Sequence, residues 1–269
     1  VTDAGCEYFE IGFRTNRNLL QNKGKWCYCD EDDINKISDA YDGCEIAVMA
    51  KLGTVTIEDF LPSKMSKIKL VRILIARVTK LGDKNLSKYN LNDLNNAKQF
   101  AIDLLDLGYK VCINLGCGDL IDDEELEIIC NTFYDLPILC LYLADTYGGF
   151  NSKNIPIQFH KFYDTLENLD SKIELGFHIH NNNGDGLEKA KTAIFHGCNF
   201  IDVSINGLGR GAGNLKYEEY LCYKYEGDTL KEKIRPIINF FNKNLISKKD
   251  YINFKIQQHP YYNIAGKLS

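Results

Sequence analysis

Short apolar runs alternate with longer amphipathic stretches along the whole chain. The apolar runs have the length and composition of buried strands, and they cover residues 8–13, 45–49, 70–74, 110–115, 138–144, 173–180 and 200–205. Between them, apolar residues recur at helical spacing over residues 31–41, 91–107, 122–134, 157–169, 186–196 and 217–225. This alternation shows no break in composition, and it predicts one α/β domain of parallel strands joined by crossover helices.

The number of strands favours a particular closed architecture. A (β/α)8 TIM barrel of about 250 residues has eight strands, whereas the 269 residues here contain seven strand-like runs. The sequence opens on Val1 instead of Met, and residues 2–5 resemble the end of a helix. We therefore predict a barrel that lacks its N-terminal strand over residues 1–225, followed by a C-terminal helical extension over residues 226–269. An open doubly wound sheet, which needs no eighth strand, is the alternative.

Composition and charge narrow the class of protein. The chain is 45% hydrophobic and 26% charged, as is typical of globular domains, and its net charge of -5 argues against a nucleic-acid partner. Apolar runs such as residues 136–144 fall far short of the roughly 20 residues that cross a bilayer. We expect no membrane association and a cytoplasmic location. Ten cysteines scattered through apolar segments are expected to be free, buried thiols, and Cys27 and Cys29 lack the spacing of a zinc site.

A pair of histidines ends the sixth predicted strand. His178 and His180 are two residues apart, so their side chains point to the same face of the strand. At the carboxyl end of a barrel strand that direction leads into the mouth of the barrel, where active sites lie. Two imidazoles on one face suit a divalent metal, and the polar residues 181–186 that follow are typical of a loop at such a site. A pair of hydrogen-bonded core histidines is the alternative interpretation.

A glycine-rich segment follows the seventh predicted strand. Residues 207–214 read Gly-Leu-Gly-Arg-Gly-Ala-Gly-Asn, and glycines allow backbone N–H groups to approach an anionic ligand closely. We therefore expect Gly209, Gly211 and Arg210 to contact a substrate anion, with Arg210 pairing through its guanidinium. Asn214 is the last residue of this segment, and we expect its amide oxygen to be within reach of the metal bound by the histidine pair.

The fifth predicted strand also ends in polar residues. Asp145 follows the strand and is expected to support a metal ligand from behind, while the Thr146 hydroxyl is a candidate hydrogen-bond donor to a substrate carboxylate. A simple Asp-capped turn is the alternative.

Two charged residues interrupt apolar strands. Glu10 lies within the first run and Arg72 within the third, and buried charges are uncommon unless they are paired or functional. We expect them to pair with one another in the barrel interior, and they are our candidate catalytic residues. His160 and His196 have no comparable setting and are interpreted as surface or packing residues. The segment His-Pro-Tyr-Tyr (259–262), which follows the predicted barrel, is interpreted as non-catalytic, and a tyrosine of this segment that acts as an acid is the alternative.

Four motifs together resemble a known family. Phe-His-Ile-His-Asn-Asn (177–182), the glycine-rich segment 207–214, Ala-Asp-Thr-Tyr-Gly-Gly (144–149) and Phe-Glu-Ile-Gly-Phe-Arg (9–14) resemble the metal-dependent aldolase and lyase superfamily on the TIM barrel. That superfamily, which shares the pyruvate carboxyltransferase-like domain, includes 4-hydroxy-2-oxovalerate aldolase, hydroxymethylglutaryl-CoA lyase and isopropylmalate synthase. The resemblance spans roughly residues 1–225, and it is nearest to the aldolases.

The resemblance implies specific roles for these residues. His178 and His180 would be ligands of Mg²⁺ or Mn²⁺, Asn214 would lie on or near the metal, and Thr146 would help to hold the substrate. Glu10 would match the glutamate of the family's Asp-Arg-Glu signature, whose other two members lie on the first strand of the barrel. No Arg-Asp-Gly segment occurs in this sequence.

The implied activity is the cleavage or formation of a C–C bond of a 2-oxo acid through a metal-stabilised enolate, with pyruvate as product or substrate. A homo-oligomer and a dehydrogenase partner both remain open. The alternative from another class is a non-catalytic barrel, a pseudoenzyme or binding subunit without the first-strand Arg-Asp motif. A further alternative is an unrelated barrel isomerase or synthase whose glycine-rich loop binds phosphate.

Overall fold

A computed structural model describes residues 6–38, 43–77 and 88–224 and the helical positions 235, 236, 238, 239 and 243. Most of the predicted C-terminal extension, including residues 259–262, lies outside the described residues. Its separation from the barrel at residue 225 stays a prediction.

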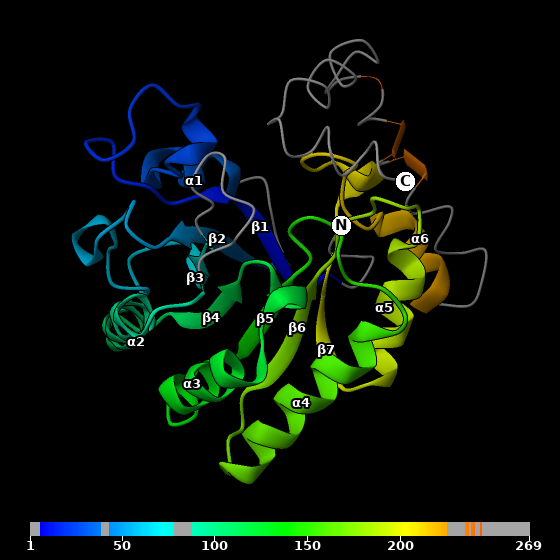
Figure 1. Ribbon diagram of the computed structural model, residues 1–269. Helices are drawn as coiled ribbons and strands as arrows, with labels where there is room; N and C mark the ends of the chain where they lie inside the picture. The colour runs from blue at the N-terminus through cyan, green and yellow to red at the C-terminus, as the bar shows by residue number, and fades with distance from the viewer. Residues whose placement is uncertain are drawn as a thin grey trace.

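Within the described residues, seven parallel strands form one curled sheet, with helices along its outer face (Figure 1). The strands are paired in sequence order, and they are β1 (Tyr8–Phe13), β2 (Glu45–Lys51), β3 (Ile68–Ile75), β4 (Lys110–Leu115), β5 (Cys140–Ala144), β6 (Glu174–His178) and β7 (Cys198–Asp202). Right-handed crossovers in a constant direction place all helices on one side of a sheet, whereas a doubly wound sheet reverses direction halfway. The predicted incomplete barrel is therefore confirmed over the doubly wound alternative.

The helices lie where the periodicity predicts them. They are α1 (Glu31–Ser38), α2 (Leu91–Asp106), α3 (Asp123–Phe133), α4 (Asn154–Asn168), α5 (Gly186–Phe195) and α6 (Tyr217–Lys224). Local chemistry sets several boundaries: the Asn90 side chain caps α2, and Asp122 and Glu125 form a reciprocal capping box at α3. The α4 helix begins three residues before the predicted start, because Pro156 is tolerated in a first helical turn.

Five predicted strands end or begin differently in the structure. The β2 strand extends to Lys51, and the β3 strand covers Ile68–Ile75 instead of 70–74. The β6 strand stops at His178, so that His180 lies beyond it in an isolated antiparallel bridge to Asn214. The β7 strand covers Cys198–Asp202 instead of 200–205, and Ile205 opens the short 3-10 helix η5 (Ile205–Gly207). The β5 strand begins at Cys140 and not at residue 138.

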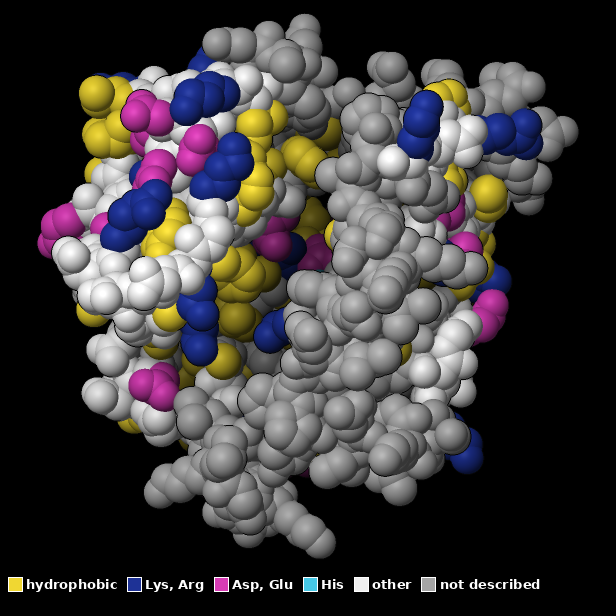
Figure 2. Space-filling model, turned by 90° about the horizontal axis from the view of Figure 1, so that it is seen from above, with side chains coloured by type: hydrophobic (Ala, Val, Ile, Leu, Met, Phe, Trp, Pro, Cys, Tyr) yellow, Lys and Arg dark blue, Asp and Glu magenta, His cyan; other side chains and the backbone are white. Residues whose placement is uncertain are grey.

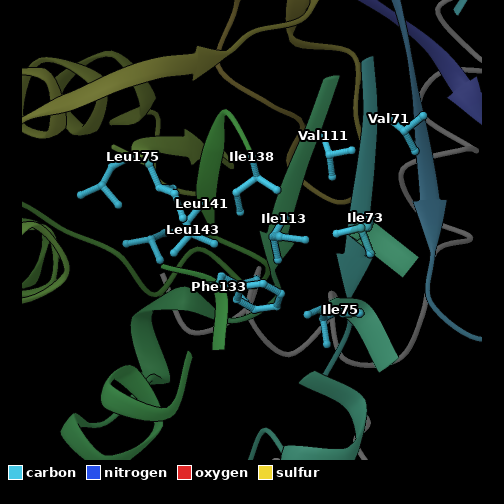
Figure 3. Packing of buried hydrophobic residues seen from close by; sticks show 14 of the residues in the cluster. Val71, Ile73, Ile75, Val111, Ile113, Phe133, Ile138, Leu141, Leu143 and Leu175 are labelled. Atoms are coloured by element: carbon cyan, nitrogen blue, oxygen red, sulfur yellow. The ribbon is translucent and has the colours of Figure 1, made fainter. Parts of the chain in front are cut away.

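The main core lies between the sheet and its helices. Alternate residues of the strands, such as Ile113 on β4 and Leu141 and Leu143 on β5, are fully buried and point toward Phe133 of α3 (Figure 3). All ten cysteines lie among the described residues and none forms a disulfide, as expected. Within the part of the chain that the structure describes, no helix combines the length and apolar character that crossing a membrane requires.

The concave face of the sheet, the barrel interior, carries a second and smaller core. Cys112, Cys140 and Tyr142 pack there, and Gly176 of β6 faces them. A Cβ at residue 176 would lie 2.7 Å from both the Cys140 sulfur and the Tyr142 ring. Only glycine therefore fits at this position without displacing the side chains of Cys140 and Tyr142.

We predict that Gly176→Ala destabilises the protein by about 1–3 kcal/mol, the usual cost of overpacking a core. Gly24→Ala is the matched control, because a Cβ at residue 24 meets nothing within 4 Å. Denaturant unfolding of the two variants measures both values. Equal midpoints for the two would contradict the tight interior packing.

Candidate functional site

Arg72 lies at the centre of the barrel interior, and its contacts define the arginine cluster. Its Nη1 donates to Glu10 Oε2 at 2.9 Å, and its Nη2 donates to Asp202 Oδ2 at 2.6 Å and Asn114 Oδ1 at 3.3 Å. The guanidinium lies 4.2 Å from the ring centroid of Tyr142. The expected pair of Glu10 and Arg72 is thus present, and Arg72 joins β1 to β7, the two edges of the described sheet.

The two carboxylates around Arg72 differ in their electrostatic settings. Burial disfavours the charged form of Asp202, but Arg72 and the hydrogen bond from His178 outweigh it and lower its pKa to about 2. Burial raises the pKa of Glu10 despite the charge of Arg72. Because 30% of the Glu10 side chain is exposed, solvent weakens that effect. Asp202 is therefore the firmly ionised partner of Arg72.

The two histidines lie next to this cluster. His178 Nδ1 is 2.8 Å from Asp202 Oδ2, and the ring centroids of His178 and His180 are 5.3 Å apart. His180 is 3% exposed, and its Nδ1 has no hydrogen-bond partner among the described residues. Burial, together with the nearby His178 and Arg210, lowers the pKa of His180 to about 3. His180 is thus neutral at physiological pH, as a metal ligand must be.

The glycine-rich loop is fastened alongside the end of β6. The backbone N–H of Asn181 donates to the Gly213 carbonyl at 2.8 Å, and that of Leu215 donates to the Ile179 carbonyl at 3.1 Å. These bonds place Asn214 opposite His180. A Cβ at Gly209 would lie 2.4 Å from Asn214 Oδ1, so the close packing of this amide accounts for glycine there.

The other predicted substrate-binding residues are more dispersed. Arg210 is exposed on the loop, and Gly211 adopts a left-handed conformation with φ +61°. The Thr146 hydroxyl accepts the backbone N–H of Cys117 at 2.8 Å. The proposed contacts of these residues with substrate stay predictions.

Asp145 faces the helices and not the barrel interior. It is fully buried and accepts the Lys189 ammonium of α5 at 2.9 Å. Lys189 is itself 2% exposed, and it also donates to the His180 carbonyl at 3.4 Å and contacts Asp185 at 3.3 Å. Asp145 therefore supports His180 through Lys189 and the backbone, from behind the site.

The remaining described histidines lie apart from the site. His160 of α4 and His196, which follows α5, contact each other through ring nitrogens 2.8 Å apart on the outer surface. This agrees with their interpretation as surface residues.

The residues present suit a divalent ion in part. His178 and His180 offer imidazole nitrogens, Asn214 offers an amide oxygen, and the unpartnered Nδ1 of His180 is a buried polar atom that lacks a neighbour. No group of three or more His, Cys, Asp or Glu side chains among the described residues is placed to hold a metal. The end-on view in Figure 2 shows a hollow with acidic and basic side chains inside it.

Some residues that build the site were not singled out from the sequence. Asp202, Asn114 and Lys189 are the main ones. Two of them could have been found from the alternation of side chains along a strand. Asn114 and Asp202 are each an even number of positions from the interior-facing residues of their strands and therefore share their face. Lys189 has no such signal, since a lysine on an amphipathic helix ordinarily faces solvent.

A curled parallel sheet with polar side chains at the carboxyl ends of its strands is the architecture of a TIM-barrel enzyme, and a family model specifies it further. The HMGL-like family model matches residues 22–235, and the chain belongs to that family. The matched residues include Arg72, both histidines and Asn214, whereas Glu10 precedes them.

Individual relatives agree with this assignment. The chain is 27% identical over 191 residues to "4-hydroxy-2-oxovalerate aldolase 2" of Nocardia farcinica, a match that covers 70% of this chain and 49% of the relative. It is 27% identical over 242 residues to "4-hydroxy-2-oxovalerate aldolase" of Bacillus thuringiensis, covering 86% of this chain and 64% of the relative. The chain thus spans about half to two thirds of the length of these relatives.

The fold has a solved counterpart. The crystal structure of hydroxymethylglutaryl-CoA lyase from Pseudomonas aeruginosa matches with a TM-score of 0.64 at 15% identity, and the match covers 93% of this chain and 86% of that one. At this identity the likeness concerns the fold alone.

We predict that Lys189→Met destabilises the protein by about 3–5 kcal/mol, because it leaves the buried Asp145 charge without a partner. Lys191→Met is the control, since Lys191 pairs with Glu188 near the surface of the same helix. Chemical denaturation provides the measurement. A small effect at residue 189, equal to that at 191, would show that Asp145 does not depend on this lysine.

A second prediction concerns Asp119 in the 3-10 helix η4 (Gly118–Leu120). Burial, and then the charge of Asp145, raises its pKa to about 6, and its buried Oδ1 has no described partner. The folded protein therefore holds this proton more tightly than the unfolded chain, so the associated stability is complete below about pH 4 and is lost as the pH rises through about 6.

Asp119→Asn should accordingly raise the free energy of unfolding at pH 7.5 by about 1–3 kcal/mol and change it little at pH 4. Denaturant melts at both pH values measure the difference. An equal effect at the two values would refute the shifted pKa.

Proposed function

We propose that this chain is a divalent-metal-dependent aldolase or lyase that cleaves or forms a C–C bond of a 2-oxo acid, most like 4-hydroxy-2-oxovalerate aldolase. The observation that carries the proposal is the convergence of His178, His180 and Asn214 at the carboxyl edge of the sheet, beside the arginine cluster. Membership of the HMGL-like family and the names of the aldolase relatives support it.

His178, His180 and Asn214 would hold the metal, Mg²⁺ or Mn²⁺. The two imidazole rings, whose centroids are 5.3 Å apart, would bind one ion jointly. When bound, such an ion stabilises the negative charge that develops on the carbonyl oxygen of a 2-oxo acid as the C–C bond breaks.

The net charge of the arginine cluster is negative, so it attracts an anionic substrate only when a cation is bound beside it. Glu10 and Asp202 contribute two negative charges and Arg72 one positive charge. A divalent ion would reverse the resulting single negative charge, and a monoanionic 2-oxo acid would then be attracted to the site.

The other predicted residues would bind and orient this substrate. Thr146, whose hydroxyl is oriented by the Cys117 N–H, and Arg210, with Gly209 and Gly211 beside it, are the candidates for the substrate carboxylate. Glu10 and Arg72 are the candidate catalytic residues, in contact across the barrel interior. An aldehyde as the second product, a homo-oligomer and a dehydrogenase partner are suggested by the resemblance to the aldolases. The residues of the site do not bear on them.

The proposal is tested with the full chain, Mn²⁺ or Mg²⁺, and a 4-hydroxy-2-oxo acid or oxaloacetate, by measuring released pyruvate. We expect turnover that a chelator abolishes and added metal restores. His178→Ala should lower kcat/KM at least about a hundredfold, because it removes several kcal/mol of charge stabilisation. His160→Ala, on the outer surface, is the matched control.

Two outcomes would contradict the proposal in different ways. Metal binding at His178 without turnover of any 2-oxo acid would favour the non-catalytic barrel. Neither metal binding nor turnover, but saturable binding of phosphate at Arg210, would favour the unrelated barrel enzyme.

A further inference from the structure

Asp202 occupies a position between the histidine pair and the arginine cluster. It ends β7 directly beside His178, since the two are Cα partners in the parallel pairing of β6 and β7. Its Oδ2 receives two contacts, from His178 Nδ1 at 2.8 Å and from Arg72 Nη2 at 2.6 Å. Among the described residues, no other member of the arginine cluster hydrogen-bonds to either histidine of the pair.

These contacts determine which nitrogen of His178 carries the proton. An aspartate paired with a buried arginine is ionised, and an ionised carboxylate only accepts hydrogen bonds. His178 must therefore donate from Nδ1, and in the neutral form of the ring the lone pair is then on Nε2. The bond also fixes the orientation of the ring, because Asp202 is held by β7 and by Arg72.

His180 provides an internal contrast. Its Nδ1 is buried without a hydrogen-bond partner among the described residues, so no carboxylate sets its tautomer. The two histidines of the pair are thus held by different means: His178 by a charged side chain, and His180 by the loop bridge to Asn214 and the contact of Lys189 with its carbonyl.

We propose that Asp202 is a positioning residue that holds His178 in the Nδ1–H form and presents its Nε2 to the metal. This proposal rests on the proposed function only in taking His178 as a metal ligand. Arg72 contributes by holding Asp202 in place, so that a cluster spanning β1, β3 and β7 sets the geometry of one ligand on β6.

Asp202→Asn tests this role, and Glu10→Gln is its matched control. Each variant removes one of the two negative charges on Arg72, but only the first removes the carboxylate that accepts from His178. A purely structural role, in which Asp202 merely neutralises Arg72, predicts similar effects for both.

The first readout is the tautomer of His178 in the metal-free chain, from two-bond ¹H–¹⁵N correlations of ¹⁵N-histidine-labelled protein. Only five histidines are present, and His178→Ala assigns the signal. We expect the Nδ1–H form in the unmodified protein and in Glu10→Gln, and a mixture of both neutral forms in Asp202→Asn. A proton on Nε2 of His178 in the unmodified protein would overturn the proposal, even if the variants fail to fold.

The second readout is the affinity for Mn²⁺, followed by electron paramagnetic resonance of the free ion. Asp202→Asn should weaken binding about 10–100-fold, as the loss of such a carboxylate partner does elsewhere, and Glu10→Gln should weaken it less. Equal weakening in the two variants would overturn the positioning role. If the unmodified chain binds no Mn²⁺ while the tautomers behave as expected, the proposed function fails and the orientation of His178 by Asp202 stands.

Discussion

The whole site depends on one buried guanidinium. Arg72 is 6% exposed, and a cation in that position is tolerated only because Glu10 and Asp202 balance it and Asn114 and Tyr142 surround it. These four partners come from four strands of the described sheet, and Glu10 and Asp202 lie on its two edge strands. Arg72 therefore connects electrostatically two strands that do not pair through their backbones. Any change that moves it also moves Asp202 and, through it, His178.

Because side chains alternate along each strand, the residues of the main core and those of the candidate site lie on opposite faces of the sheet. Residues that face the helices, such as Ile113 and Leu143, are aliphatic and form the main core. Those that face the interior change along a strand from apolar to charged or polar, as from Leu70 to Arg72 on β3 and from Cys112 to Asn114 on β4. Because the two sets alternate along the same strands, the polar layer takes its rigidity from the aliphatic one.

A second buried charge, on Lys189, holds the loops that follow β5 and β6. Lys189 reaches from α5 to Asp145 and to the backbone of His180, and so links the loops that follow β5 and β6. A paired lysine and aspartate in so apolar a position cost more in desolvation than an apolar pair would. Their presence is understandable as a constraint on geometry: the position of His180 is set by a directional contact and not by packing alone.

The sequence by itself determined the α/β class, the seven strands, the positions of helices α1 to α6 to within a few residues, and the presence of polar groups at strand ends. Hydrophobic periodicity and glycine placement are local properties, so one chain read alone is enough for them. The pairing of Glu10 with Arg72 could also be anticipated, because two opposite charges in apolar strands have few other means of neutralisation.

Only the tertiary structure decided which of these polar side chains contact one another. That Asp145 pairs with Lys189 behind the site, and that Asp202 joins Arg72 to His178 within it, depends on which face of each strand meets which neighbour. The same applies to the close packing of Gly209 against the Asn214 amide, which no local pattern indicated. Register and curvature bring together residues up to 130 positions apart, and no local pattern encodes such distances.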